Sequence, residues 1–111
     1  MKSQIQIRVL GCIQRSGFYK IPRTTSLGLA IKKAGGFAKD PYPPSGNISI
    51  RSKRIRDGEY YQRQRINYKN NLNALGILLR DGDLITIQYD VRGPLVPIPT
   101  GIYIIKKILK N

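Results

Sequence analysis

The chain has 111 residues, which is long enough for one compact domain and too short for two ordinary ones. Its 20 Lys and Arg residues against 6 Asp and Glu give a formal net charge of +14, which indicates a polyanionic partner such as nucleic acid, an anionic polysaccharide or an acidic lipid surface, or else an acidic neighbouring subunit. One Cys and no His exclude an internal disulfide, a zinc site built from Cys and His clusters, and any Ser-His-Asp or Cys-His catalytic arrangement.

Residues 4–10 predict the first strand. Ile5, Ile7 and Val9 alternate with polar residues, which is the pattern of a strand with one buried face, and Gly11 begins to end it. The same alternation interrupts the apolar run that a secretory signal needs, so we expect no signal peptide in this chain. No stretch approaches the roughly 18 to 20 apolar residues of a bilayer span, so we expect no transmembrane segment.

The run Val9-Leu10-Gly11-Cys12 also resembles a bacterial lipid-attachment site. A lipidated Cys requires a signal peptide before it, and the polar residues upstream disrupt the apolar core of such a peptide. We therefore expect Cys12 to be a buried, reduced small residue where the first strand passes into a turn.

A hairpin and a helix are predicted next. Gly17 to Ile21 form a second, shorter strand that stops at Pro22, which cannot donate to a ladder. Thr25 or Ser26 can cap a helix of about 9 to 10 residues with an apolar face repeating at i, i+3, i+4 and i+7. Gly35 suits the left-handed residue that follows the helix.

A proline-rich loop and a long hairpin follow. Three prolines in residues 40–47 exclude both helix and ladder there. Asp57-Gly58 lies between two β-type runs, Asn47 to Arg56 and Glu59 to Tyr68, which is a strong hairpin signal. On the second arm, strand alternation places Tyr61, Arg63, Arg65 and Asn67 on one face, opposite Tyr60, Ile66 and Tyr68.

The remaining segments are short. Leu72 to Leu79 is expected to be a turn or a single helical turn, and Arg80 to Asp83 a tight turn. Leu84 to Tyr89 is nearly continuous in apolar character, which predicts a central strand buried on both faces. Residues 91–111 form a C-terminal extension, a Pro-rich linker plus a short basic helix or strand, which we expect to dock on a neighbouring subunit or to begin a following domain.

This order of elements is typical of an α+β fold, the β-grasp or ubiquitin-like roll, in which a mixed sheet packs on one short helix. We therefore expect residues 1–90 to form the domain, with the first and last strands parallel at its centre. The fold alone does not give a function. A plant-type iron–sulfur ferredoxin is excluded because it needs four Cys ligands.

Four groups of residues carry a resemblance to a known family. They are Val9-Leu10-Gly11-Cys12-Ile13 with Gly17-Phe18-Tyr19 and Ile21-Pro22; Ser26-Leu27 with Ala30-Ile31 and Ala34-Gly35-Gly36-Phe37; Ile77-Leu78-Leu79; and Asp81-Gly82-Asp83 with Ile85. In order and spacing they closely resemble the soluble-ligand-binding β-grasp (SLBB) family over residues 5–89, and most closely the domains of outer-membrane polysaccharide export proteins.

The resemblance implies a non-enzymatic domain that binds or assembles in a capsule or exopolysaccharide export system. Its implied partners are an anionic polysaccharide or neighbouring subunits of a homo-oligomer, with no cofactor. It further implies a periplasmic or envelope-associated location, whereas the missing signal peptide indicates the cytoplasm if the chain is complete.

Seven residues of these motifs are expected to serve the fold rather than a ligand. Gly17 and Gly82 suit turns that need positive φ, and the pair Gly35-Gly36 closes the helix. Asp81 or Asp83 can accept hydrogen bonds from backbone N–H groups of the turn. The set is Gly11, Gly17, Gly35, Gly36, Asp81, Gly82 and Asp83. Because the turn explains Asp81 and Asp83, no catalytic residue and no metal ligand is expected, and we expect no enzyme.

The candidate ligand residues lie in the long hairpin. Between residues 51 and 69 there are seven cations against two carboxylates, with three tyrosines among them. Arg and Tyr on a sheet face suit sugars and also single-stranded nucleic acid, so a nucleic-acid-binding module of a DNA-uptake-type protein is the alternative. A solvated strand whose charges discourage edge-to-edge aggregation is the structural alternative. The candidates are Arg51, Lys53, Tyr61, Arg63 and Arg65.

Overall fold

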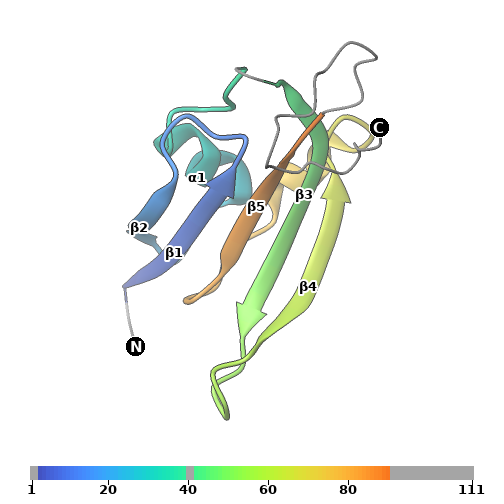
Figure 1. The fold of residues 1–111 in the computed structure, drawn as a ribbon. Helices are drawn as coiled ribbons and strands as arrows, with labels where there is room; N and C mark the ends of the chain where they lie inside the picture. Colours follow the sequence, from blue (N-terminus) through green and yellow to red (C-terminus); the bar gives the residue numbers. More distant parts are fainter. Residues whose placement is uncertain (1–2, 40–41, 91–111) are drawn as a thin grey trace, which may run out of the picture.

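The computed structural model describes residues 3–39 and 42–90. These form a small α+β domain in which a five-stranded mixed sheet of order β2-β1-β5-β3-β4 packs against one α-helix and one 3-10 helix (Figure 1). The elements are β1 (Gln4–Gly11), β2 (Gly17–Pro22), α1 (Leu27–Lys33), β3 (Pro44–Lys53), β4 (Tyr60–Asn67), the 3-10 helix η1 (Leu72–Gly76) and β5 (Leu84–Tyr89).

The first and last strands lie side by side at the centre of the sheet, as the sequence predicts. β1 pairs with β5 in parallel, from Arg8 opposite Leu84 to Gly11 opposite Ile87. The other pairings, β1 with β2 and β3 with both β5 and β4, are antiparallel. The parallel pairing is therefore confirmed.

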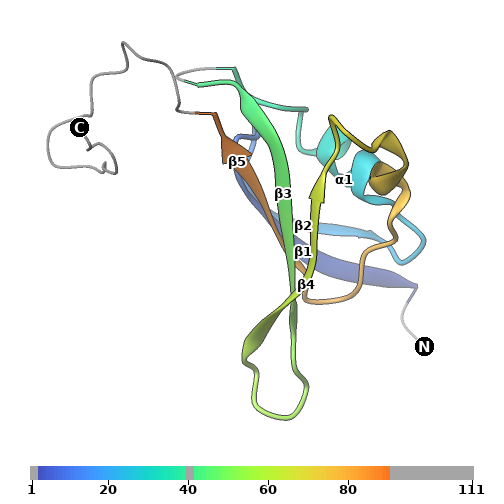
Figure 2. The same cartoon turned by 90° about the vertical axis from the view of Figure 1, so that its right-hand side faces the viewer.

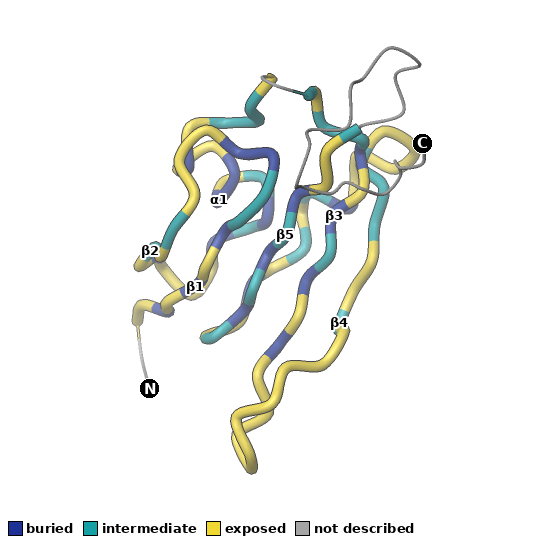
Figure 3. Tube along the Cα trace, viewed as in Figure 1, coloured by how far each residue is buried: buried dark blue, intermediate teal, exposed yellow. Residues whose placement is uncertain are grey.

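The core lies on one side of the sheet only. Figure 2 shows α1 and η1 on the same side, and Figure 3 shows buried residues following β1, β5 and β3 while β4 is largely exposed. The core side is apolar because alternate residues of the three central strands face the helices. These buried residues are Ile5, Ile7 and Val9 of β1, Ile85 and Ile87 of β5, and Ile48 and Ile50 of β3, packed against Leu27, Ala30 and Ile31 of α1.

Several predicted details are wrong. β5 is buried on one face only, whereas burial on both faces was predicted. Ile85 and Ile87 are buried but Gln88 is exposed, because no described helix covers the second face of the sheet. α1 has 7 residues. It is shorter than the expected helix of about 9 to 10 residues, because Gly35 at φ +92° ends the helical conformation. β3 begins at Pro44, inside the predicted loop, because the first residue of a strand does not have to donate to the ladder.

A β-bulge changes which residues of β4 share a face. Ile50 lies opposite Gln64 and Arg51 opposite Gln62, so Arg63 is an extra residue in β4. Tyr61 and Arg63 consequently lie on the core side of the sheet, and Arg65 and Asn67 on the other side. The prediction that these four side chains share one face is wrong, since it assumed a regular strand.

The C-terminal extension, residues 91–111, lies outside the described residues, so the expected linker and basic element stay predictions. Within residues 3–39 and 42–90, no helix has the length and apolar character needed to cross a membrane.

Candidate ligand-binding face

The side of the sheet away from α1, called the open face here, carries a polar groove. The groove has a volume of about 530 Å³ and crosses β4, β3 and β5. Amide, hydroxyl and guanidinium groups dominate its lining. Its polar lining residues are Asn47, Ser49 and Arg51 of β3, Gln62 and Arg65 of β4, and Thr86 and Gln88 of β5.

Hydrogen bonds hold the amide side chains of the groove in place. The Ser49 hydroxyl donates to Gln62 Oε1 at 3.0 Å, while Gln62 Nε2 donates to the carbonyls of Ile50 and Gln64 at 3.3 and 2.7 Å. Asn67 Nδ2 donates to Asn47 Oδ1 at 3.0 Å. The floor of the groove is thus ordered before any ligand arrives, which lowers the entropic cost of binding.

The open face is positively charged. None of the five strands contains an Asp or a Glu. By strand alternation and pairing, Arg8, Lys20, Arg51, Lys53 and Arg65 all lie on this face. In the described part of the chain no carboxylate pairs with Arg51 or Arg65, so both guanidinium groups are available to an anion.

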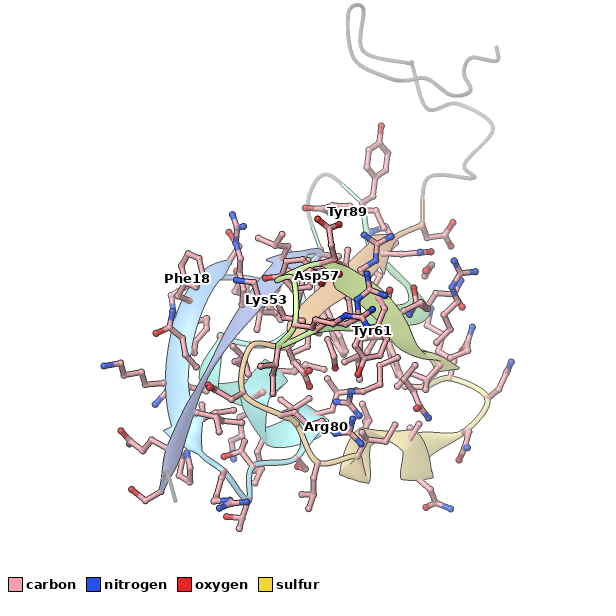
Figure 4. All side chains as sticks on the ribbon, turned by 90° about the horizontal axis from the view of Figure 1, so that it is seen from below. Phe18, Lys53, Asp57, Tyr61, Arg80 and Tyr89 are labelled. Atoms are coloured by element: carbon pink, nitrogen blue, oxygen red, sulfur yellow. The ribbon has the colours of Figure 1, made fainter. Side chains whose placement is uncertain are left out.

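Two aromatic rings lie at opposite ends of the open face. Phe18 on β2 is 65% exposed, and the guanidinium of Arg8 lies 5.0 Å from its ring centroid. Tyr60 on β4 is 44% exposed, with Lys53 Nζ at 5.7 Å from its ring. In Figure 4, Phe18 lies to one side over β2 and Lys53 near the middle, while Arg80 lies on the side of the helices.

The structure brings together three of the five candidate ligand residues. Arg51 and Arg65 line the groove, and Lys53 lies on the same face. Tyr61 lies opposite Ser52 on the core side of the sheet. Arg63 lies there too, so these two side chains cannot act with the groove.

Arg63 instead forms a buried ion pair. Its Nη2 donates to Asp83 Oδ2 and its Nε donates to Ser52 Oγ at 2.8 Å. The Ser52 hydroxyl donates to Asp83 Oδ1 at 2.7 Å, and the N–H of Arg80 donates to Asp83 Oδ2 at 2.8 Å. Asp83 therefore closes the turn before β5, as predicted, and Arg63 is a structural residue.

Other motif residues also serve the fold. Gly17, Gly35, Gly36 and Gly82 all have positive φ, as expected for turns and for the end of a helix. Asp81 Oδ1 accepts from the N–H of Gln6 at 2.8 Å and so links the turn to β1.

The neutral polar residues of the groove were missed at the level of sequence. Asn47, Ser49, Thr86 and Gln88 alternate with buried isoleucines in β3 and β5, and that alternation was the available signal. Gln62 could not be assigned to the open face, because its position depends on the bulge.

Cys12 is buried, as predicted. Its side chain is fully inaccessible, it forms no disulfide, and its thiol donates to the carbonyl of Ala38 at 3.1 Å. Burial raises the pKa of the Cys12 thiol and outweighs a smaller lowering effect of the Ala38 backbone. The thiol is therefore neutral and shielded at pH 7.

No group of three or more His, Cys, Asp or Glu side chains among the described residues is placed to hold a metal ion. Neither a protein-family model nor a curated protein matches this chain. Its function therefore has to be inferred from the chemistry of the open face.

Proposed function

We propose that this protein is a non-enzymatic SLBB domain with a β-grasp fold that binds an acidic polysaccharide on its open face, as part of a polysaccharide export system. The sheet order, the parallel pair β1 and β5, and the helix packed on one side support the fold. The positive φ of the motif glycines and the turn made by Asp83 support the family.

The observation that carries the proposal is the groove with two unpaired arginines among fixed amides. Sugar hydroxyls both donate and accept hydrogen bonds, as do amide and hydroxyl side chains. A guanidinium binds a carboxylate with two parallel hydrogen bonds, which suits a uronic acid. Neighbouring strands lie about 4.8 Å apart, so the three strands under the groove span about 10 Å and the whole open face about 19 Å, which leaves room for more than one sugar unit.

Single-stranded nucleic acid is the second candidate, and the exposed rings of Phe18 and Tyr60 favour it. Bases stack on such rings while cations contact the phosphates. The two rings, however, lie on opposite edge strands of the sheet, and the groove is lined by amides, hydroxyls and guanidinium groups rather than aromatic rings. This lining suits hydroxyl-rich sugars better than a stack of bases.

Calorimetric titration with oligosaccharides of a uronic acid, a neutral glucan and a thymidine oligonucleotide tests the proposal. We expect the acidic oligosaccharide to bind most tightly. Arg65→Gln and Arg51→Gln should each weaken that binding by about tenfold, the usual loss for a hydrogen bond to a charged group. Lys33→Gln, which removes one exposed charge from α1, is the matched control.

An equal loss in all three variants would contradict the proposal, because the net charge alone would then explain binding. Tighter binding of the oligonucleotide, with a steep salt dependence, would favour the second candidate.

The proposal includes assembly with neighbouring subunits in the periplasm or envelope, which the resemblance implies. Sedimentation velocity of the full chain tests this part separately. We expect a species heavier than the monomer, and a monomer at all concentrations would remove assembly from the proposal while leaving binding on the open face in place.

A further inference from the structure

The hairpin between β3 and β4 projects beyond the other strands (Figures 1 and 2). Its tip, residues 54–59, carries Ile55, whose relative exposure of 104% is the highest among the large apolar residues of the described chain. An isoleucine in this position contributes nothing to the core. A single exposed apolar residue is common on protein surfaces, so Ile55 gains significance only from the projecting tip and from the side chains beside it.

The tip is an ordered turn rather than a loose loop. The N–H of Arg54 donates to the carbonyl of Glu59, and the N–H of Gly58 to the carbonyl of Arg54, both at 2.8 Å. The Arg54 guanidinium donates twice to the Asp57 carboxylate, at 3.2 and 2.9 Å, and Asp57 Oδ1 also accepts from the N–H of Glu59. Gly58 takes the φ of +74° that closes the turn. Ile55 is thus presented at little entropic cost.

Cations and tyrosines lie near this isoleucine in the chain. Its neighbours are Arg54 and Arg56, Lys53 ends β3 just before them, and Tyr60 and Tyr61 begin β4 at the neck of the hairpin, both exposed. Asp57 is paired with Arg54, and Glu59 is the other carboxylate of the tip. An apolar residue beside tyrosines and cations matches the boundary between lipid headgroups and acyl chains, where tyrosine rings and basic side chains are favoured.

The charges of the domain argue against a second copy of the chain as the partner. The apolar pocket between α1 and η1, about 370 Å³ and lined by Gly28, Ile31, Phe37 and Leu75, has Lys32 at its edge. A smaller pocket beside Ile5 and Leu79 carries two arginines, Arg23 and Arg80, against Asp81. Each pocket carries a net positive charge, as the hairpin does, so either pocket would repel the hairpin of a second copy. An anionic lipid surface attracts it instead.

We propose that the tip of the β3–β4 hairpin inserts Ile55 into the headgroup region of an anionic lipid bilayer, with Lys53 and Arg56 contacting lipid phosphates. The hairpin then anchors the domain at a membrane surface while the groove stays free for a polymer. The inference rests on residues other than those that line the groove and is independent of the proposed function.

The chain contains no Trp, so a single introduced tryptophan reports on insertion. In the full chain carrying Ile55→Trp, we expect a blue-shifted emission with vesicles of phosphatidylcholine and phosphatidylglycerol, and quenching by brominated acyl chains. Leu72→Trp is the matched control, because Leu72 is 70% exposed but lies in η1, away from the hairpin. Its emission should not shift.

Vesicle co-sedimentation gives the second measurement. Ile55→Asp should lower partitioning into anionic vesicles by about tenfold, the value of one buried isoleucine. Arg56→Gln should lower it by about fivefold, the value of one cation at such a surface. Leu72→Asp should leave it unchanged.

An unshifted emission of the Ile55→Trp variant while the chain co-sediments with anionic vesicles would overturn the inference, because the net charge alone would then hold the protein to the surface. A shift with an acidic polypeptide but not with vesicles would also overturn it and identify a protein partner. Adding Arg65→Gln to the Ile55→Trp variant should leave the emission shift in place. A failure of polysaccharide binding in the groove can therefore be told apart from a failure of lipid insertion by the hairpin.

Discussion

Gly11 and Cys12 fix the end of β1 through two different contacts. Gly11 has φ +94°, and a Cβ built there would lie 2.1 Å from the carbonyl oxygen of Ile87 in β5. That carbonyl accepts the N–H of Cys12 at 2.8 Å. The run that resembles a lipid-attachment site is therefore a point where the two central strands approach closely.

Gly11→Ala should lower the free energy of unfolding by about 3 kcal/mol or more, because the positive φ and the backbone clash both oppose a side chain. Gly36→Ala is the control, since Gly36 has φ +84° but nothing within 4 Å of its added Cβ. It should cost about 1 kcal/mol. Urea denaturation measures both, and equal losses would show that the contact with Ile87 does not matter.

The raised pKa of Cys12 predicts a dependence of stability on pH. The folded state keeps the thiol proton at a pH where the unfolded chain has lost it, so the stabilising contribution is complete below the ordinary pKa of 9.0 and falls as the pH rises above it. Between pH 9 and the ordinary Tyr pKa of 10.0, the free energy of unfolding of the Cys12→Ala variant should therefore fall less with pH than that of the unsubstituted chain. Denaturation at several pH values measures it, and an unchanged slope would refute the assignment.

The β3–β4 hairpin is joined to the turn before β5 by Arg63, Ser52 and Asp83. The carboxylate of Asp83 is fully buried and the side chain of Arg63 is 11% exposed. Removing one partner of such a pair leaves the other charge without compensation in a poorly solvated position. The bulge in β4 is what directs Arg63 into this position.

Asp83→Asn should therefore lower the free energy of unfolding by about 3 to 5 kcal/mol. The control is Asp57→Asn, which breaks the solvent-exposed pair with Arg54 and should cost less than about 1 kcal/mol. Thermal and urea denaturation would measure both. A small effect at Asp83 would mean that water reaches the pair.

Local patterns predicted the elements well because each has a local cause. Period-two alternation predicted β1, the Asp-Gly dipeptide predicted the hairpin, and a cap at Thr25 or Ser26 predicted the start of α1, where Ser26 is the cap in the structure. The bulge in β4 has no such signal, since it depends on the fit of Arg63 to a carboxylate 20 residues away. The candidate residues on the two sides of the bulge were therefore wrongly assigned to one face.

The whole molecule has two unlike surfaces on one sheet. One side is apolar and covered by α1 and η1, whereas the other carries cations, amides and hydroxyls and no strand carboxylate. The net charge of +14 strengthens the attraction of any polyanion to that side. Composition predicted the sign of the partner's charge, but only the pairing of strands shows which cations gather on one face.

Binding of an acidic polysaccharide on the open face is tested most directly by titrating the isotope-labelled chain with a uronic acid oligosaccharide and following backbone and side-chain amide signals by NMR. The shifts should concentrate on the groove, at Ser49, Gln62, Arg65, Thr86 and Gln88, and residues of α1 and η1 should stay unperturbed. Shifts that gather on the helices, or that spread evenly over all exposed cations, would contradict a binding site on the open face.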